Sequence, residues 1–193
     1  MSNVLGTALL FLINTIFDLY LFVLMVRIIL VYVGANYFDP ITRFIIKLTD
    51  FIVKPVRRFI PNVKRFELAS ILILFVLEIF KFLLVLLISF GTLNVLGLLL
   101  LALGDILKRL FITFFYAVLV QVILSWLQPY SPMNRLLYQF IAPVSRPFQR
   151  LIPPISGIDI TPIFVLILLQ LLIIIIANPL MGIAFGLAIG SSA

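Results

Sequence analysis

The feature that most constrains this chain is a series of long apolar stretches that alternate with two basic ones. Apolar runs cover residues 4–33, 68–103 and 161–177, and a further run leads up to Leu127. A helix of about 20 apolar residues crosses the hydrocarbon core of a bilayer. In this chain 64% of the residues are apolar and only 11% are charged, against about 25% charged in a soluble domain. A water-soluble fold could therefore not bury all of these apolar runs. We predict an all-α integral membrane protein with about four transmembrane helices, near 4–33, 68–90, 104–127 and 161–178.

Two boundaries of these spans are ambiguous. Residues 91–104 are apolar but contain Gly91, Thr92, Asn94 and Gly97, so the sequence leaves open a loop, a re-entrant segment or the start of the third span. Likewise Asp105, Lys108 and Arg109 either mark a short loop or lie inside a long third helix.

The fourth span is predicted to begin at Thr161-Pro162, because Thr is a good N-cap and Pro suits the first helical position. Asn178-Pro179 should kink or end it. The tail 179–193 then holds two overlapping Gly-x-x-x-Gly steps, a pattern that permits close helix approach, either within the bundle or between copies in a homo-oligomer. Their residues are Gly182, Gly186 and Gly190.

The amino-acid inventory excludes most enzyme chemistry. The chain has no Cys and no His, which removes disulfides, the usual zinc and haem ligands, and Ser-His or Cys-His pairs. We expect no enzymatic activity, no cofactor and no metal. The net charge of +7, in so apolar a chain, favours anionic membrane lipids rather than nucleic acid as partners.

The first basic stretch, residues 35–67, holds seven of the fourteen cations. Several of them recur at helical spacing on one face, opposite a row of apolar residues. This pattern is typical of a basic amphipathic helix in the headgroup plane, which Pro55 is expected to split into two pieces. The stretch 129–161 is a weaker basic counterpart. The predicted surface for lipid, or for a cytoplasmic or membrane protein partner, consists of Arg43, Lys47, Lys54, Arg57, Arg58, Arg135, Arg146 and Arg150.

The chain also repeats itself. Shifting the sequence by 92 positions aligns residues 54–61 with 146–153, and Glu67 with Asp159; upstream, a shift of 94 pairs Arg27 with Gln121. Matching prolines and arginines over such a length indicate two tandem copies, 1–97 and 98–193. Each copy would be a span, a basic loop helix and a second span, and the two copies would enter the membrane with the same orientation.

The repeated block is a Pro-x-x-Arg-x-Ile-Pro motif, present as Pro55, Arg58 and Pro61 and again as Pro147, Arg150 and Pro153. The second copy continues through Pro154, Gly157, Asp159, Thr161 and Pro162. With these motifs the chain closely resembles the YggT family, called YlmG in Gram-positive bacteria and plastids. The resemblance implies a small integral membrane protein without an assigned enzymatic activity. It also implies an association with osmotic stress tolerance or cell division.

We interpret the repeated motif as a structural corner at which the surface helix turns toward the next span. Its prolines fix the backbone, and Arg58 and Arg150 are expected to make directed hydrogen bonds there or to bind a lipid phosphate. Glu67 and Asp159 should close the same corners, by capping the following helix or by pairing with the arginine.

Charged residues inside the spans form a second group of candidates. Asp18, Arg27, Glu78 and Lys81 would be costly in hydrocarbon, so they should face one another or a polar cavity. Glu78 and Lys81 can pair at i, i+3, whereas Arg27 could snorkel to the interface. Together with Gln121 and Gln170 they could instead line a polar path.

Charge also predicts the topology and, with it, the function. In a four-span arrangement the two basic stretches share a side and carry ten cations against two in 104–109, so the positive-inside rule places them in the cytoplasm and the termini outside a bacterial inner membrane. We predict a non-enzymatic membrane protein that organises lipid or a partner at this face. The alternative is a small oligomeric ion or osmolyte channel.

Overall fold

The computed structural model describes residues 4–90, 94–151 and 159–190, which fold into helices joined by short connections. In chain order the helices are α1 (Val4–Val33), α2 (Pro40–Arg57), α3 (Leu68–Ser89), α4 (Val95–Leu127), α5 (Pro132–Leu151), α6 (Thr161–Leu172), the π-helical η1 (Ile173–Ala177) and α7 (Asn178–Ala188). Four segments are long and apolar enough to cross a membrane: α1, α3, α4 and the continuous run Thr161–Ala188. The predicted all-α fold with four spans is therefore confirmed.

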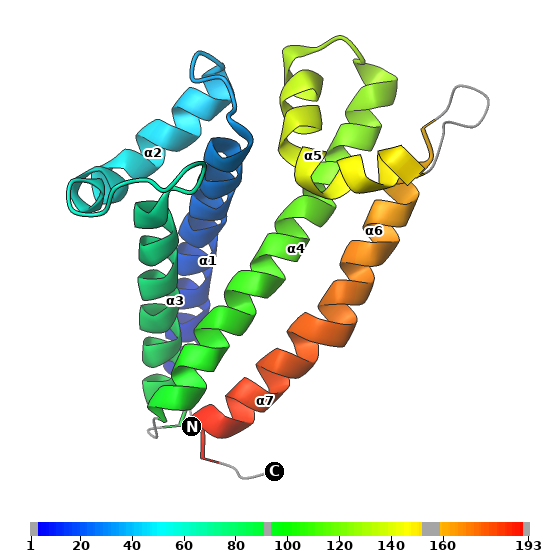
Figure 1. The fold of residues 1–193 in the computed structure, drawn as a ribbon. Coiled ribbons are helices and arrows are strands. Elements are labelled where there is room, and N and C mark those ends of the chain that lie inside the picture. Colours follow the sequence, from blue (N-terminus) through cyan, green and yellow to red (C-terminus); the bar gives the residue numbers. More distant parts are fainter. Residues whose placement is uncertain (1–3, 91–93, 152–158, 191–193) are drawn as a thin grey trace.

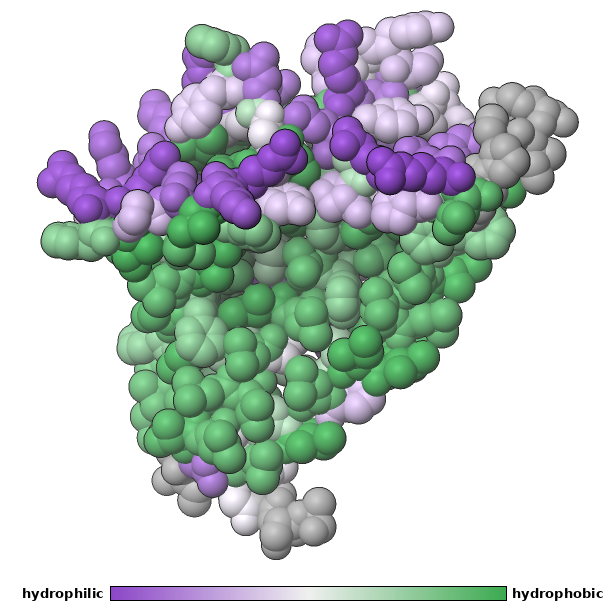
Figure 2. Space-filling model, in the orientation of Figure 1, coloured by the Kyte–Doolittle hydropathy of each residue, from purple (hydrophilic) through white to green (hydrophobic). Residues whose placement is uncertain are grey.

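The two shorter helices, α2 and α5, lie at the same end of the bundle (Figure 1). The start of α1 and the end of α7 lie at the opposite end. Hydrophilic residues form a band over α2 and α5, while the surface below that band is apolar (Figure 2). This division is the one expected of a protein whose spans face hydrocarbon and whose loop helices lie at a headgroup surface.

Local sequence explains why α2 and α5 start where they do. The Asp39 carboxylate accepts hydrogen bonds from the backbone N–H groups of Ile41 and Thr42, and the Ser131 hydroxyl accepts one from Asn134. In each helix a proline follows the cap directly, where its fixed φ suits the first turn. α2 buries a stripe at steps of four, three and four residues, the period of an amphipathic helix. The stripe consists of Thr42, Ile46, Thr49 and Val53.

The helix boundaries follow the offsets of the sequence repeat. α1 and α4 end 94 positions apart, at Val33 and Leu127, and α2 and α5 start 92 positions apart, at Pro40 and Pro132. The copies also contact each other: the Gln139 side-chain amide of α5 donates to the backbone carbonyls of Val33 and Gly34, at 3.1 Å and 3.0 Å. Each copy thus forms a span, a loop helix and a second span, as the repeat indicates.

The third span is longer than the predicted 104–127. Helix α4 begins at Val95, because the Asn94 side chain accepts hydrogen bonds from the N–H groups of Leu96 and Gly97 and so caps the first turn. Asp105, Lys108 and Arg109 consequently lie inside a continuous helix. Gly91 and Thr92 lie outside the described residues.

The prolines interrupt the helices less than predicted. Pro55 does not split α2, which continues to Arg57; since Pro55 lies in the last turn, only the hydrogen bond from its missing N–H is lost there. Asn178-Pro179, which was expected to kink or end the fourth span, does not end it, because the span continues to Ala188; the α-helix is interrupted just before this pair. The π-helical turn η1 precedes this pair, and π-turns let a helix absorb such a local mismatch.

Gly182 of the predicted Gly-x-x-x-Gly ridge does not contribute to the close approach of α7 and α4. A Cβ atom added at Gly97 would collide with the backbone of Leu187 and Ala188, whereas one added at Gly182 would meet open space. On α7 the buried small residues are Ala184 and Ala188. The close approach therefore depends on Gly97 of α4 and the alanines of α7.

Candidate functional site

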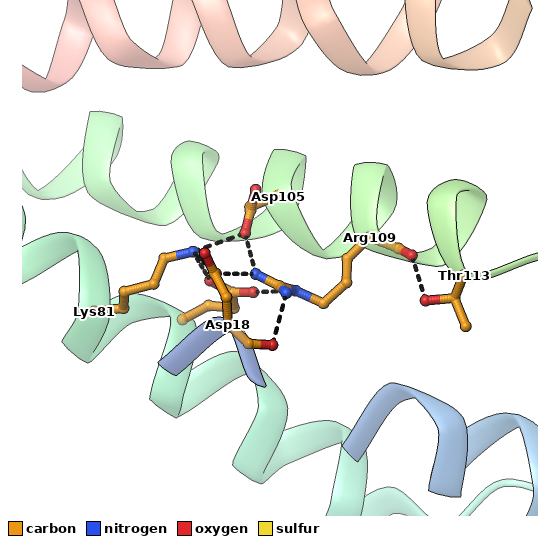
Figure 3. Close-up of polar contacts among 6 residues, drawn as sticks. Asp18, Lys81, Asp105, Arg109 and Thr113 are labelled. Atoms are coloured by element: carbon orange, nitrogen blue, oxygen red, sulfur yellow. Dashed lines mark hydrogen bonds and ion pairs between the residues drawn. The ribbon is translucent and has the colours of Figure 1, made fainter. Parts of the chain in front are cut away.

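Five charged side chains meet near the middle of the membrane-spanning part (Figure 3). Glu78 lies ten residues after the start of α3 and eleven before its end, which at 1.5 Å per residue is about 15 Å from either end. We call this group the intramembrane charge cluster. It consists of Asp18 from α1, Glu78 and Lys81 from α3, and Asp105 and Arg109 from α4.

Each of the two cations in the cluster contacts all three carboxylates. Lys81 Nζ lies 3.1 Å from Asp18 Oδ1, 3.1 Å from Glu78 Oε2 and 2.9 Å from Asp105 Oδ2. Arg109 Nη2 donates to Asp18 Oδ1 and to Asp105 Oδ2, both at 2.8 Å, and its Nε donates to Glu78 Oε1 at 3.0 Å. These contacts tie the spans of the first copy to the first span of the second.

Chemically, the cluster compensates charges that would be costly alone in hydrocarbon. Glu78 and Lys81 are almost fully buried, whereas the Asp18 side chain is 49% exposed. The structure therefore brings Asp18, Glu78 and Lys81 together and adds two partners, Asp105 and Arg109, that the sequence analysis did not select. Their i, i+4 spacing within an apolar stretch could have identified them, because oppositely charged residues at this spacing can form an ion pair on one helix.

Arg27 forms a second buried cluster where α1, α2 and α3 meet. Its Nε and Nη2 atoms donate to the two carboxylate oxygens of Glu67, at 2.7 Å and 2.9 Å, and its Nη1 donates to Asp50 at 2.7 Å and to Thr49 at 2.8 Å. The arginine is only 2% exposed, so it does not snorkel to the interface. Its planar fork instead fixes the loop helix against both spans of its copy.

The charges of this second cluster shift the pKa of Glu67, the residue that precedes α3. Burial raises the pKa of its carboxyl, but hydrogen bonds from Arg27 and Ser70, together with the charges of Arg27 and Arg57, outweigh burial and hold the pKa below the ordinary value of 4.5. The Ser70 hydroxyl lies 2.6 Å from Glu67 Oε2. Glu67 is therefore held as a carboxylate.

The predicted corner pairing is different in the structure. Glu67 pairs with Arg27 and, at 3.6 Å, with Arg57 rather than with Arg58. Asp159 holds the first turn of α6, since its Oδ1 accepts from the Thr161 N–H at 2.8 Å. Thr161 is the first residue of this helix rather than its predicted N-cap, which is Ile160. Arg58 and Arg150 are exposed and form no ion pair with any described residue.

The other motif residues lie on or beside the loop helices and the fourth span. Pro55 and Pro147 lie inside α2 and α5, exposed Pro61 follows α2, and Pro162 lies in the first turn of α6. Pro153, Pro154 and Gly157 lie outside the described residues.

The basic candidates lie together on one surface. All eight are exposed and belong to α2, α5 and the residue after α2. This arrangement concentrates positive charge at the end of the bundle where the loop helices lie.

The two glutamines do not extend the polar network of the spans. Gln121 is buried in α4, and Gln170 of α6 is exposed. Neither forms a hydrogen bond with a member of the cluster.

Comparison with known proteins agrees with this architecture. A model of the CCB3/YggT family matches residues 6–88 and again residues 100–180, one segment for each copy of the repeat. The chain belongs to the CCB3/YggT family. It is 37% identical over 175 residues to an uncharacterized protein of Vibrio alginolyticus, covering 89% of this chain and 92% of the relative. The uncharacterized protein YggT of Escherichia coli K12 is 33% identical over 164 residues, covering 84% and 85%.

No solved structure matches the chain. For this CCB3/YggT protein, the double match supports the repeat that the helix boundaries show. The four spans make it a multi-pass membrane protein, and its relatives are bacterial.

Proposed function

We propose that this CCB3/YggT protein is a non-enzymatic membrane protein that binds the anionic lipid surface of the cytoplasmic face through α2 and α5. The observation that carries the proposal is that eight exposed cations lie on two amphipathic helices at one end of the bundle. Each juxtamembrane cation contributes about 1 kcal/mol near an anionic leaflet. A partner protein recruited to this lipid-bound face would fit the association with osmotic stress tolerance or cell division that the resemblance to the YggT family implies.

The orientation follows from the charges of the connections. With Lys108 and Arg109 inside α4, residues 90–94 on the other side carry no cation, whereas the two basic stretches carry ten. The positive-inside rule then assigns α2 and α5 to the cytoplasm.

The channel alternative gains no support from the geometry. Asp18, Glu78 and Lys81 form ion pairs with one another and with α4, and Gln121 and Gln170 form no hydrogen bond with them. The members of the intramembrane charge cluster therefore pair with one another instead of lining a path across the membrane.

The proposal is tested by lipid-dependent thermal stability of the purified protein in detergent. Phosphatidylglycerol should raise the unfolding temperature more than phosphatidylcholine with the same acyl chains. Replacing Arg43, Lys47, Arg135 and Arg146 by Gln should abolish this difference. The matched variant with Lys at the three arginines should keep it, because lysine is an equally good point charge at a phosphate surface. An undiminished preference for phosphatidylglycerol in the Gln variant would overturn the proposal.

A further inference from the structure

An apolar groove of about 300 Å³ separates the two copies of the repeat. It is lined by α1 and α2 of the first copy and by α4 and α5 of the second. The hydroxyl of Thr113, one of its lining residues, donates to the carbonyl of Arg109 within α4 at 2.7 Å. The groove therefore offers a ligand little beyond apolar contact.

The lining of this groove follows the repeat. In the spans, Phe22 and Val26 of α1 stand 94 positions before Tyr116 and Val120 of α4. In the loop helices, Ile41 and Ile45 of α2 stand 92 positions before Met133 and Leu137 of α5. Equivalent residues of both copies thus face one space, which puts the groove on the axis that relates the copies. Membrane proteins built from repeats often bind their ligands at such an interface.

The groove is open toward the side of the bundle at membrane depth. Phe22 and Val120 line it from the spans and are 46% and 42% exposed, while α2 and α5 border it on the headgroup side. Whatever enters must therefore come from the bilayer and must be apolar.

The position of the groove favours a lipid chain as its occupant. Its exposed rim at membrane depth faces the hydrocarbon chains of the bilayer. A hydrocarbon chain is flexible and can follow an irregular lining. Its headgroup would lie beside α2 and α5, where Arg43 and Arg135, again 92 positions apart, are exposed.

We propose that the groove binds one acyl chain of a membrane phospholipid, whose headgroup lies against α2 and α5. The preference for an anionic headgroup rests on the proposed function, whereas the acyl site depends on the groove alone. Such a lipid would join the two copies of the repeat across this groove.

The test uses the full-length protein in mild detergent and counts retained lipid by native mass spectrometry after incubation with phosphatidylglycerol or phosphatidylcholine carrying identical oleoyl chains. Ala117→Phe adds bulk to the groove lining, and Val120→Phe does so at the rim, where a folding defect is less of a risk. Ala8→Phe, at an exposed position of α1 outside the groove, is the matched control. We expect both groove variants to lose one tightly held lipid per chain and the control to keep it.

The outcomes separate this proposal from the proposed function. Retention of the lipid in folded Val120→Phe and Ala117→Phe proteins would overturn the acyl site, even if phosphatidylglycerol is still preferred. Loss of the lipid from the groove variants, with no preference between the two headgroups, would support the acyl site and count against the proposed function. If the wild type holds no lipid at all, the acyl site is wrong.

Discussion

At the residue scale, Arg27 is the side chain that joins the loop helix of the first copy to its two spans. It holds two buried or half-buried carboxylates, Glu67 and Asp50, from two other segments. The sequence analysis selected both Arg27 and Glu67 but expected Glu67 either to cap the following helix or to pair with Arg58. The motif suggests partners for Glu67 that are near it in the sequence. Its actual partner, Arg27, is 40 residues away and is brought close only by packing of the spans.

Replacing Arg27 by Gln, the residue at the equivalent position of the second copy, should lower the free energy of unfolding by about 3–5 kcal/mol, because Glu67 is then a buried carboxylate without its main partner. Thermal or denaturant unfolding in detergent measures this. Arg43→Gln, which removes an exposed arginine of α2, should stay within about 0.5 kcal/mol of the wild type. Equal effects of the two changes would show that the buried pairing is unimportant.

Glu67 should also give the protein a specific pH dependence. Because its pKa in the folded protein is below 4.5, its contribution to stability is complete above that ordinary value and is lost as the pH falls through the lower, folded-state value. The stability difference between wild type and Glu67→Gln should therefore be constant near neutral pH and shrink below 4.5. Unfolding temperatures of both proteins across that range test this, and a difference that grows on acidification would contradict it.

The intramembrane charge cluster allows a prediction from its charge balance. It holds three carboxylates and two cations, so losing a cation leaves a larger uncompensated charge than losing a carboxylate. Arg109→Gln should lower the unfolding temperature strongly. Asp18→Asn should lower it much less, since that side chain is half-exposed and the remaining charges then balance. A larger loss for Asp18→Asn than for Arg109→Gln would rule out this account.

At the element scale, hydrophobic periodicity predicted the spans and the amphipathic loop helices, because the membrane and the headgroup surface each select a simple pattern. Prolines were the less reliable guide. Pro55 and Pro179 were expected to interrupt helices, yet each lies where a helix tolerates it, in a last turn or just after a π-turn. Sequence alone does not show such tolerance, because it depends on where the helix finds caps and packing partners.

The packing of α4 on α7 leads to a matched pair of glycine changes. Gly97→Ala should destabilise the protein, because the added Cβ meets the backbone of α7 and forces the helices apart. Gly182→Ala meets open space and should be neutral or stabilising by up to about 1 kcal/mol, since Ala is the better helix former. Unfolding temperatures in detergent compare the two, and equal stabilisation by both would exclude the close approach at Gly97.

At the scale of the whole molecule, the repeat was the most informative pattern in the sequence. It predicted two copies of one unit, and the helix boundaries follow its offsets. It could not predict how the copies divide their polar residues. The first copy pairs Arg27 with Glu67, while the second has Gln121 and Asp159 at the same positions, and Asp159 holds the first turn of α6 instead. The repeated motif is present in both copies, but the contacts of the polar residues around it differ because each copy packs differently.

The orientation in the membrane is the last prediction, and the absence of cysteine makes it direct to test. Asn62 and Tyr130 are exposed in the connections beside α2 and α5, and Ser89 is exposed at the end of α3 on the other side of the bundle. In intact cells, an impermeant thiol reagent should label Ser89→Cys and leave Asn62→Cys and Tyr130→Cys unlabelled until the membrane is opened. Labelling of both basic-side positions from outside would invert the assigned orientation. Labelling of only one of them would mean that the two copies enter the membrane in opposite directions, because a parallel repeat must place α2 and α5 on a single side.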